Sequence, residues 1–187
     1  MEDLGHVLRK HLFISDSDWS VIQEHFHPLS TPKDHILTHQ NTIEHRLYFI
    51  TDGIVRLYYE AEEKDITLNF GFPESFINCY SSFLTQTDSK FILQTLSPCE
   101  LVYITRDELE NLYSITDCGQ HLGRLFAENL FLYLSKREDS FVLHSPTERY
   151  LKLFDEQPHL IQQIPLKYLA SYIGITPQAL SRIRAKL

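Results

Sequence analysis

The first part of the chain has a helical spacing of hydrophobic residues. Trp19, Ile22 and Phe26 follow one another at intervals that put their side chains on one face of an α-helix. Ser15 or Asp16 stands before them as a helix N-cap. The pattern predicts helical structure up to about Phe26.

A pattern typical of short strands begins after Phe26. From "DHILTHQ" to "KFILQTLSPCELVYI", runs rich in Val, Ile, Tyr and Phe alternate with turn residues such as Thr51-Asp52-Gly53 and Ser97-Pro98. Strands this short and this closely spaced predict a β-sandwich or jelly roll.

Helical spacing returns after Ile104. The segment "TRDELENLYS" opens with the Thr-x-x-Glu pattern of a capping box, formed by Thr105 and Glu108. A long helix is then predicted from about Asp117 to Leu143, with apolar residues on more than one face. A further helix is predicted to start at Ser145-Pro146, in "SPTERYLKLF".

The wide apolar surface of the long helix predicts a seam between two copies of the chain. Asn129 would be a polar residue that fixes the register of the pair. The alternative is that the helix packs only on its own β-domain, and we favour the dimer. The residues predicted to form the interface are Leu122, Leu125, Phe126, Asn129, Leu132 and Tyr133.

The C-terminal segment predicts two short helices joined by a tight turn. Pro165 suits the first turn of a helix, and Gly174 can end that helix with a positive φ. Thr176 is a good N-cap for the second helix, with Pro177 as its first residue. One face of the first helix collects Leu166, Leu169, Ala170 and Ile173. A glycine-containing turn between two short helices is the pattern of a helix-turn-helix.

The second of these helices has an apolar side and a polar, cationic side. Leu180, Ile183 and Leu187 fall on the apolar side. Small and cationic side chains on the opposite side suit entry into a DNA major groove, with glutamine and arginine able to pair with base edges. The candidate DNA-binding residues are Thr176, Gln178, Ser181, Arg182, Arg184 and Lys186.

The distribution of charge favours a polyanion as the partner of this segment. The chain has 25 acidic residues against 17 Lys and Arg, a net charge of −8. From Gln157 onward, however, it contains four cations (Lys167, Arg182, Arg184 and Lys186) and no Asp or Glu. Local positive charge is what phosphate contacts require. The alternative is an ordinary helical hairpin packed on the body of the protein.

The remaining composition indicates a globular cytoplasmic protein. The 187 residues are 43% hydrophobic, enough for one large or two small domains. We expect no signal peptide and no membrane span, because the N-terminus lacks a basic and then apolar stretch and no 18 apolar residues run together. Cys79, Cys99 and Cys118 are expected to be reduced and mostly buried, and the ten histidines to be exposed or half-buried. We expect no metal site and no cofactor.

The order of these elements resembles the Crp/Fnr family of transcription regulators along nearly the whole chain. The resemblance rests on "LYFITDGIVRLYY", "SPCELVYI", "SPTERYLKLF" and "IPLKYLASYIGITPQALSRIRAKL". It implies an α+β fold with a cyclic-nucleotide-binding-like sensor β-roll at residues 1–116, a dimerisation helix at 117–144 and a DNA-binding helix-turn-helix at 145–187. It also implies a homodimer, double-stranded DNA as partner, and RNA polymerase as a further partner. Longer members continue into a β-hairpin wing, so we expect a divergent short form without a full wing.

The sensor positions depart from the family pattern. Family members that bind cyclic nucleotides hold the ribose with a Gly-Glu pair and the phosphate with an Arg-Ser pair. The matching positions here are Asn78-Cys79 and Ser89-Lys90, and a Thr-Ser contact of the dimer helix is Leu134-Ser135. Without the arginine, we expect no tight binding of cyclic AMP. A different small-molecule effector, of unknown identity, would use a pocket formed by Asn78, Cys79, Tyr80, Ser81, Ser82, Ser89, Lys90 and Ser135.

The leading functional prediction is therefore a homodimeric, sequence-specific DNA-binding regulator rather than an enzyme. The first rival is a ligand-binding or protein-interaction module whose helix-turn-helix is vestigial. The second rival is a cupin-type metalloenzyme on the same jelly roll. That enzyme would need a His-x-His, Glu and His set pointing into the roll, and the sequence contains no such set.

Overall fold

The computed structural model describes residues 1–62 and 65–186, so Leu187, predicted for the apolar side of the last helix, lies outside the described residues. The chain forms two compact units. The first combines Met1–Glu60 with Asn69–Ala127, and the second combines Ala61–Leu68 with Glu128–Leu187. The division falls inside the long helix, because each half of that helix packs in a different unit.

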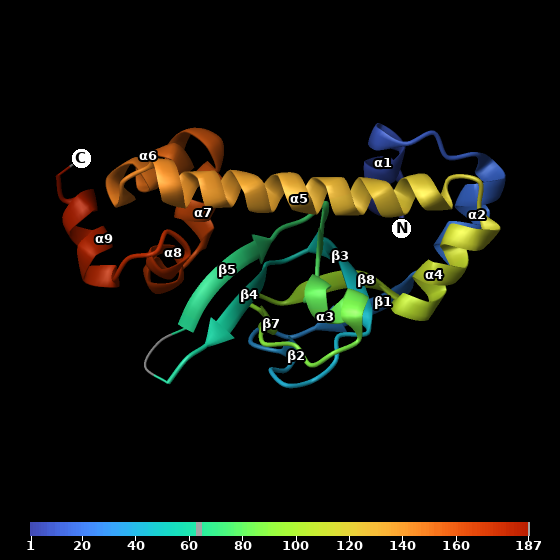
Figure 1. Ribbon diagram of the computed structural model, residues 1–187, viewed down its shortest axis with the longest axis horizontal. Helices are drawn as coiled ribbons and strands as arrows, with labels where there is room; N and C mark the ends of the chain where they lie inside the picture. Colours follow the sequence, from blue (N-terminus) through green and yellow to red (C-terminus); the bar gives the residue numbers. More distant parts are fainter. Residues whose placement is uncertain (63–64, 187) are drawn as a thin grey trace. The chain divides into compact units, whose positions relative to one another are not determined.

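The first unit is a β-roll with helices packed on one of its sheets (Figure 1). Its helices are α1 (Glu2–His11), α2 (Asp16–Glu24), α3 (Tyr80–Thr85) and α4 (Arg106–Ile115). The strands are β1 (His27–Thr31), β2 (Ile36–Thr38), β3 (Arg46–Asp52), β4 (Val55–Glu60), β5 (Asp65–Gly71), β6 (Ser75–Ile77), β7 (Ile92–Thr95) and β8 (Cys99–Thr105). They form two four-stranded sheets, ordered β1-β8-β3-β6 and β2-β7-β4-β5. The predicted α+β fold with a jelly roll is confirmed.

The second unit contains the C-terminal helices. The long helix α5 (Gly119–Leu143) enters it from the first unit, and β5 begins in it. The remaining helices are α6 (Pro146–Glu156), α7 (Pro158–Gln163), α8 (Leu166–Tyr172) and α9 (Pro177–Arg184). The sequence patterns did not predict α7, which spans only six residues and starts directly at Pro158. None of the helices in residues 1–62 and 65–186 is long and apolar enough to cross a membrane.

Local capping chemistry sets the helix boundaries. The Ser15 hydroxyl accepts a hydrogen bond from the Asp18 N–H at 3.0 Å, which confirms Ser15 as the N-cap of α2. The predicted capping box of Thr105 with Glu108 is present, and the structure shows a second one, of Ser145 with Glu148, at the predicted start of α6. Helix α5 begins two residues later than predicted. The backbone N–H groups of Asp117 and Cys118 instead donate to the Asp18 carboxylate, at 3.4 and 3.2 Å.

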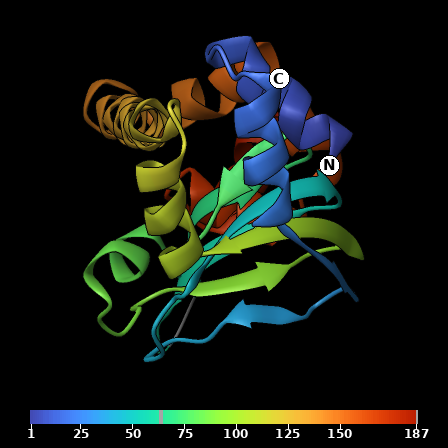
Figure 2. The same ribbon diagram turned by 90° about the vertical axis from the view of Figure 1, so that its right-hand side faces the viewer.

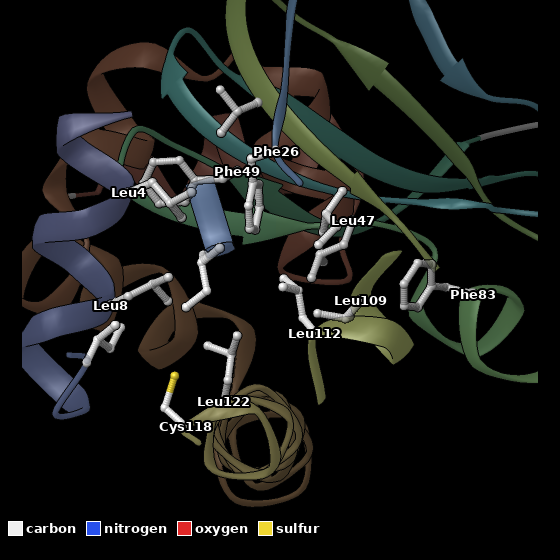
Figure 3. Close-up of a cluster of buried hydrophobic side chains, with 14 residues drawn as sticks. Leu4, Leu8, Phe26, Leu47, Phe49, Phe83, Leu109, Leu112, Cys118 and Leu122 are labelled. Atoms are coloured by element: carbon white, nitrogen blue, oxygen red, sulfur yellow. The ribbon is translucent and has the colours of Figure 1, made fainter. Parts of the chain in front are cut away.

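Strand β3 separates two hydrophobic cores by its alternating side chains. Leu47 and Phe49 point toward helices α1, α2 and α4, which lie on the same side of the strands (Figures 2 and 3). Tyr48 and Ile50 point the other way, into the roll, where they pack with residues such as Leu93. This alternation is the period-two pattern of a strand covered on both faces.

The long helix uses part of its predicted dimer seam for packing within the chain. Leu122 is only 1% exposed in the core of the first unit, and Phe126 lies 4.7 Å from the Phe76 ring. The Tyr133 hydroxyl donates to the Leu68 carbonyl at 3.2 Å. These three residues are therefore turned toward their own chain, Leu125 is half-buried, and Asn129 and Leu132 remain exposed.

The exposed side of α5 is apolar over much of its length. Leu132 is 63% exposed, and Phe131, Leu134, Val142 and Leu143 are also among the exposed large hydrophobic residues. The sequence could not distinguish the two sides because both carry large apolar residues.

Candidate nucleic-acid interface and sensor site

The turn between α8 and α9 has the geometry that the sequence predicts. Gly174 has a φ of +75°. The N–H groups of Gly174 and Ile175 donate to the carbonyls of Ser171 and Ala170, both at 3.0 Å, which is the Schellman pattern of a helix end. The Thr176 hydroxyl then accepts the Ala179 N–H at 3.2 Å and caps α9.

Helix α9 buries one side and exposes the other. Leu180 is fully buried and Ile183 is half-buried, whereas every residue predicted to contact DNA is exposed. No carboxylate in the described part of the chain forms an ion pair with Arg182, Arg184 or Lys186. The cations of this face are thus accessible to a partner, and their role on DNA stays a prediction.

Helix α8, the first helix of this pair, is hydrogen-bonded to the start of strand β5. The Ser171 hydroxyl accepts the Thr67 N–H at 2.9 Å and donates to the Asp65 carbonyl at 2.8 Å. One terminal nitrogen of Arg137 donates to the carbonyls of Thr67 and Tyr172, both at 3.2 Å. These bonds fix the end of α8 just before the turn that leads to α9.

A second arginine binds the end of α8 from helix α6. Arg149 donates from Nε to the Ile173 carbonyl at 3.0 Å and from Nη1 to the His144 carbonyl at 2.7 Å. The guanidinium groups of Arg137 and Arg149 lie over the Phe141 ring, at 5.0 and 4.6 Å. Burial, and then the charge of Arg137, lower the pKa of Arg149. These residues line a pocket of about 310 Å³ within the second unit.

The predicted sensor residues of the first unit are largely engaged in bonds to the backbone. Asn78 donates to the Arg46 carbonyl at 3.1 Å. The Ser82 hydroxyl accepts the Glu44 N–H at 2.9 Å and donates to the Thr87 carbonyl at 2.5 Å. The Ser89 hydroxyl donates to the Phe91 carbonyl at 2.9 Å and accepts the Phe91 N–H at 3.0 Å. The hydroxyls of Ser82 and Ser89 thus each donate one hydrogen bond and accept one within the chain.

The other predicted sensor residues are arranged in different ways. Cys79 is buried and Tyr80 is half-buried, whereas Ser81 and Lys90 are exposed. Ser89 is buried, whereas Lys90, the next residue along the chain, is exposed. Ser135 is half-buried and belongs to the second unit.

A glutamate that the sequence patterns did not single out occupies the middle of this group. Glu44 is 3% exposed, and its carboxylate accepts hydrogen bonds from the Thr38 hydroxyl, from the Arg46 N–H at 3.0 Å and from the Cys79 N–H. Burial raises the pKa of the Glu44 carboxyl above its usual 4.5, and these bonds offset only part of that effect. The only signal in the sequence was an acidic residue just before an apolar strand.

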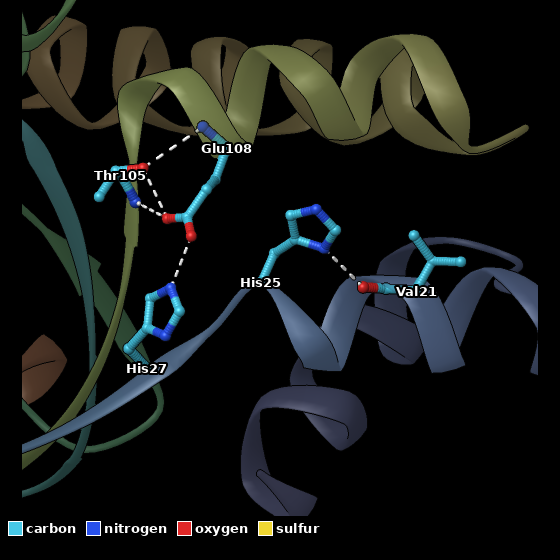
Figure 4. A network of polar contacts seen from close by, with 5 residues as sticks. All are labelled: Val21, His25, His27, Thr105 and Glu108. Carbon is cyan, nitrogen blue, oxygen red and sulfur yellow. Dashed lines mark hydrogen bonds and ion pairs between the residues drawn. The ribbon is translucent and has the colours of Figure 1, made fainter.

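The cysteines are buried, and His25 and His27 are hydrogen-bonded to other groups of the protein. All three cysteines are free and buried, and burial raises the pKa of Cys79 to about 12. Nε2 of His27 bonds Oε1 of Glu108 at 2.6 Å, and Nδ1 of His25 contacts the Val21 carbonyl at 2.9 Å (Figure 4). Although desolvation acts in the opposite direction, the bonds from Thr105 and His27 lower the pKa of Glu108 to about 2. Within residues 1–62 and 65–186, no three His, Cys, Asp or Glu side chains are grouped to hold a metal ion.

Comparison with known proteins supports this description of the first unit. Residues 28–116 match the family model of the cyclic nucleotide-binding domain. No curated protein matches the chain significantly in sequence.

Solved structures of transcription regulators share the fold of the chain. One is the cyclic di-GMP responsive global regulator CLP of Xanthomonas campestris, with 17% identity, a TM-score of 0.68, and 92% of this chain and 91% of that chain covered. FixK2 of Bradyrhizobium japonicum gives 14% identity, a TM-score of 0.74 and coverages of 87% and 84%. A Crp/Fnr family regulator of Eubacterium rectale gives 13% identity, a TM-score of 0.72 and coverages of 92% and 83%. Residues 28–116 thus match the cyclic nucleotide-binding domain, and the chain shares its fold with the solved structures of these regulators.

Proposed function

We propose that this protein is a homodimeric, sequence-specific DNA-binding transcription regulator of the Crp/Fnr type. The observation that carries the proposal is helix α9, whose exposed side presents Gln178, Ser181 and Arg182 beside further cations. The helix is capped by Thr176 and follows a Schellman turn at Gly174. Such a helix can enter a major groove, where glutamine and arginine pair with base edges while lysine contacts phosphate.

The dimer is proposed from the exposed apolar side of α5. Phe131, Leu132 and Val142 are all more than half exposed on one helix, which is unfavourable in water unless another surface covers them. A second copy of the same helix is the partner that a two-fold regulator requires. The operator is then a two-fold symmetric sequence with half-sites about one helical turn apart.

The proposal also includes where in the cell the protein acts and which other molecules it binds. The regulator acts in the cytoplasm and meets RNA polymerase at promoters. It does not bind cyclic AMP tightly, because Ser89 stands where a phosphate-binding arginine is expected and its hydroxyl bonds the Phe91 backbone. The cyclic di-GMP response stated for CLP makes cyclic dinucleotides reasonable compounds to test as effectors.

Selection from a pool of random DNA duplexes tests the proposal. The wild-type chain should enrich a two-fold symmetric motif over several rounds. A variant with Arg182, Arg184 and Lys186 changed to alanine should enrich none, while it keeps the thermal stability of the wild type because all three side chains are exposed. Failure of the wild type to enrich any motif would favour the rival function, an interaction module with a vestigial helix-turn-helix.

A further inference from the structure

The loop before strand β3 closes over the predicted sensor residues. The Asn41 N–H donates to the Ser89 carbonyl at 2.7 Å, and the Ser89 N–H donates to the Thr42 carbonyl at 2.8 Å. The Glu44 N–H bonds the Ser82 hydroxyl, and Gln86 donates to the Glu44 carbonyl at 3.3 Å. The loop is thus bonded along its length to residues 82–89, which the resemblance assigns to ligand binding.

This closure places one acidic side chain among several converging donors. The Glu44 carboxylate receives a hydroxyl from Thr38 on β2, the N–H of Arg46 on β3 and the N–H of Cys79 before α3. All three donors are neutral, and no Lys, Arg or His of the described residues forms an ion pair with Glu44. The Arg46 N–H is supplied two residues along the chain from Glu44, whereas the fold brings Thr38 on β2 and Cys79 before α3 to the same carboxylate.

Burying a carboxylate without an ion-pair partner lowers the stability of a protein unless hydrogen bonds within the protein replace those that the carboxylate made to water. Donors that meet at one buried point are also what a protein uses to hold the acidic group of a free ligand. Here the acid belongs to the chain itself and is 3% exposed.

We propose that Glu44 is a tethered carboxyl group that occupies the ligand site of the sensor roll in place of the acidic group of a diffusible ligand. The roll then has its site filled without any small molecule. A free phosphate or carboxylate compound can enter only when the Glu44 side chain leaves or is removed. The proposal concerns the first unit alone and does not depend on DNA binding.

Removal of the carboxylate from the full chain, followed by its replacement with free formate, tests this proposal. Glu44→Ala leaves the donors of Thr38, Arg46 and Cys79 without their acceptor, so the melting temperature should fall. Sodium formate at tens of millimolar should raise the melting temperature of this variant by about 3 °C relative to sodium chloride at equal ionic strength. The rise should saturate with formate concentration, and the wild type should not show it.

Two control variants separate the proposal from general effects of the salt. Glu100→Ala removes an exposed carboxylate that bonds the Ser30 hydroxyl, so formate should not stabilise this variant. Glu44→Gln keeps an acceptor oxygen in the site and should also show no formate effect. Equal responses of Glu44→Ala and the wild type to formate would overturn the proposal. If Glu44→Ala does not fold in chloride, the comparison is its refolding yield in formate against chloride, and equal yields would overturn the proposal too.

Discussion

The Ser171 hydroxyl of helix α8 is hydrogen-bonded to the Thr67 backbone of strand β5, and it also bonds the backbone of Asp65 in the same strand. The oxygen accepts the Thr67 N–H at 2.9 Å, and the hydroxyl hydrogen goes to the Asp65 carbonyl at 2.8 Å. In the sheet, β5 is an edge strand, and the unpaired backbone groups of such a strand need other partners. Thr67 is fully buried, so its N–H cannot turn to water if the Ser171 hydroxyl is lost.

Ser171→Ala should therefore destabilise the second unit by about 1–3 kcal/mol, because the Thr67 N–H and the Asp65 carbonyl both lose their hydrogen bond to this hydroxyl. Native-state hydrogen exchange at the Thr67 amide measures the effect directly, and that amide should exchange faster than in the wild type. The matched control is Ser114→Ala, whose hydroxyl contacts only the Glu110 carbonyl of its own helix. An unchanged exchange rate at Thr67 would contradict the structural role of Ser171.

Gly174 is expected to tolerate no side chain, for two reasons that can be separated. Its φ of +75° is strained for a residue with a Cβ, and an added Cβ would lie 2.7 Å from Cε1 of Phe141. Gly174→Ala should lower the free energy of unfolding by more than the roughly 1–2 kcal/mol that a side chain at this positive φ would cost by itself. Urea unfolding should give a smaller cost when the same change is made in a Phe141→Leu background. Equal costs in both backgrounds would mean that the contact with Phe141 contributes nothing.

The elements that could be predicted from the sequence are those fixed by neighbouring residues. Ser15, Thr105, Ser145 and Thr176 each bond a backbone N–H three residues ahead, so their signals stand in the local sequence. The glycine turn at Gly174 is equally local. These signals, with the short apolar runs that alternate with turn residues, were enough to predict the roll, the long helix and the turn between the last two helices.

The contacts that could not be predicted join residues far apart in the chain. Glu44 meets Cys79, and His27 meets Glu108 across 81 positions. Arg137 looked like one more polar residue of a long helix, although it binds the carbonyls of Thr67 and Tyr172. No period or spacing records such pairs, because only the folded chain brings them together. The same limit applied to α5, where the pattern did not say which apolar residues face the chain.

The raised pKa of Glu44 predicts a pH dependence of stability with a definite sign. Above pH 4.5 the unfolded chain has lost the Glu44 proton while the folded chain still holds it, so stability falls as pH rises through that window. Tyr48 and Cys79 face the same carboxyl and stay protonated there, because burial raises the pKa of each.

Glu44→Gln should remove this contribution. The stability of Glu44→Gln relative to the wild type should increase from about pH 4.5 upward and then level off, as measured by urea unfolding at a series of pH values. A constant difference at all pH values would show that Glu44 has an ordinary pKa in the folded state.

The exposed side of α5 predicts which substitution disrupts the dimer. Leu132→Glu puts a charge on an apolar residue that is 63% exposed in the chain, so it should leave the fold intact and weaken self-association at least tenfold. Sedimentation at micromolar concentration measures the mass. The matched control is Leu84→Glu, a change of an exposed leucine on α3 in the first unit. A monomeric wild type, or a Leu132→Glu variant that is still fully dimeric, would exclude this face of α5 as the interface.

Substitution of Arg182 and substitution of Lys186 should weaken DNA binding in different ways. Arg182 lies one turn after Gln178 on the exposed side of α9, inside the helix. Its planar guanidinium can bond a guanine at two points from a fixed backbone. Lys186 follows the end of that helix, and its flexible ammonium can find a phosphate but offers no fixed two-point geometry. We therefore expect Arg182 to bind a base and Lys186 to bind the DNA backbone.

Binding isotherms on the selected operator and on a scrambled duplex, at several salt concentrations, distinguish the two roles. Arg182→Ala should cost about 1–3 kcal/mol on the operator, with little effect on the scrambled duplex, and should relax the preference at one base pair of each half-site. Lys186→Ala should weaken binding to both duplexes alike and reduce the salt dependence by about one charge. Lys167→Ala, in α8, serves as a cation control outside the recognition helix. If Arg182→Ala weakens both duplexes by the same factor, Arg182 contacts phosphate, and another residue of α9 must bind the base.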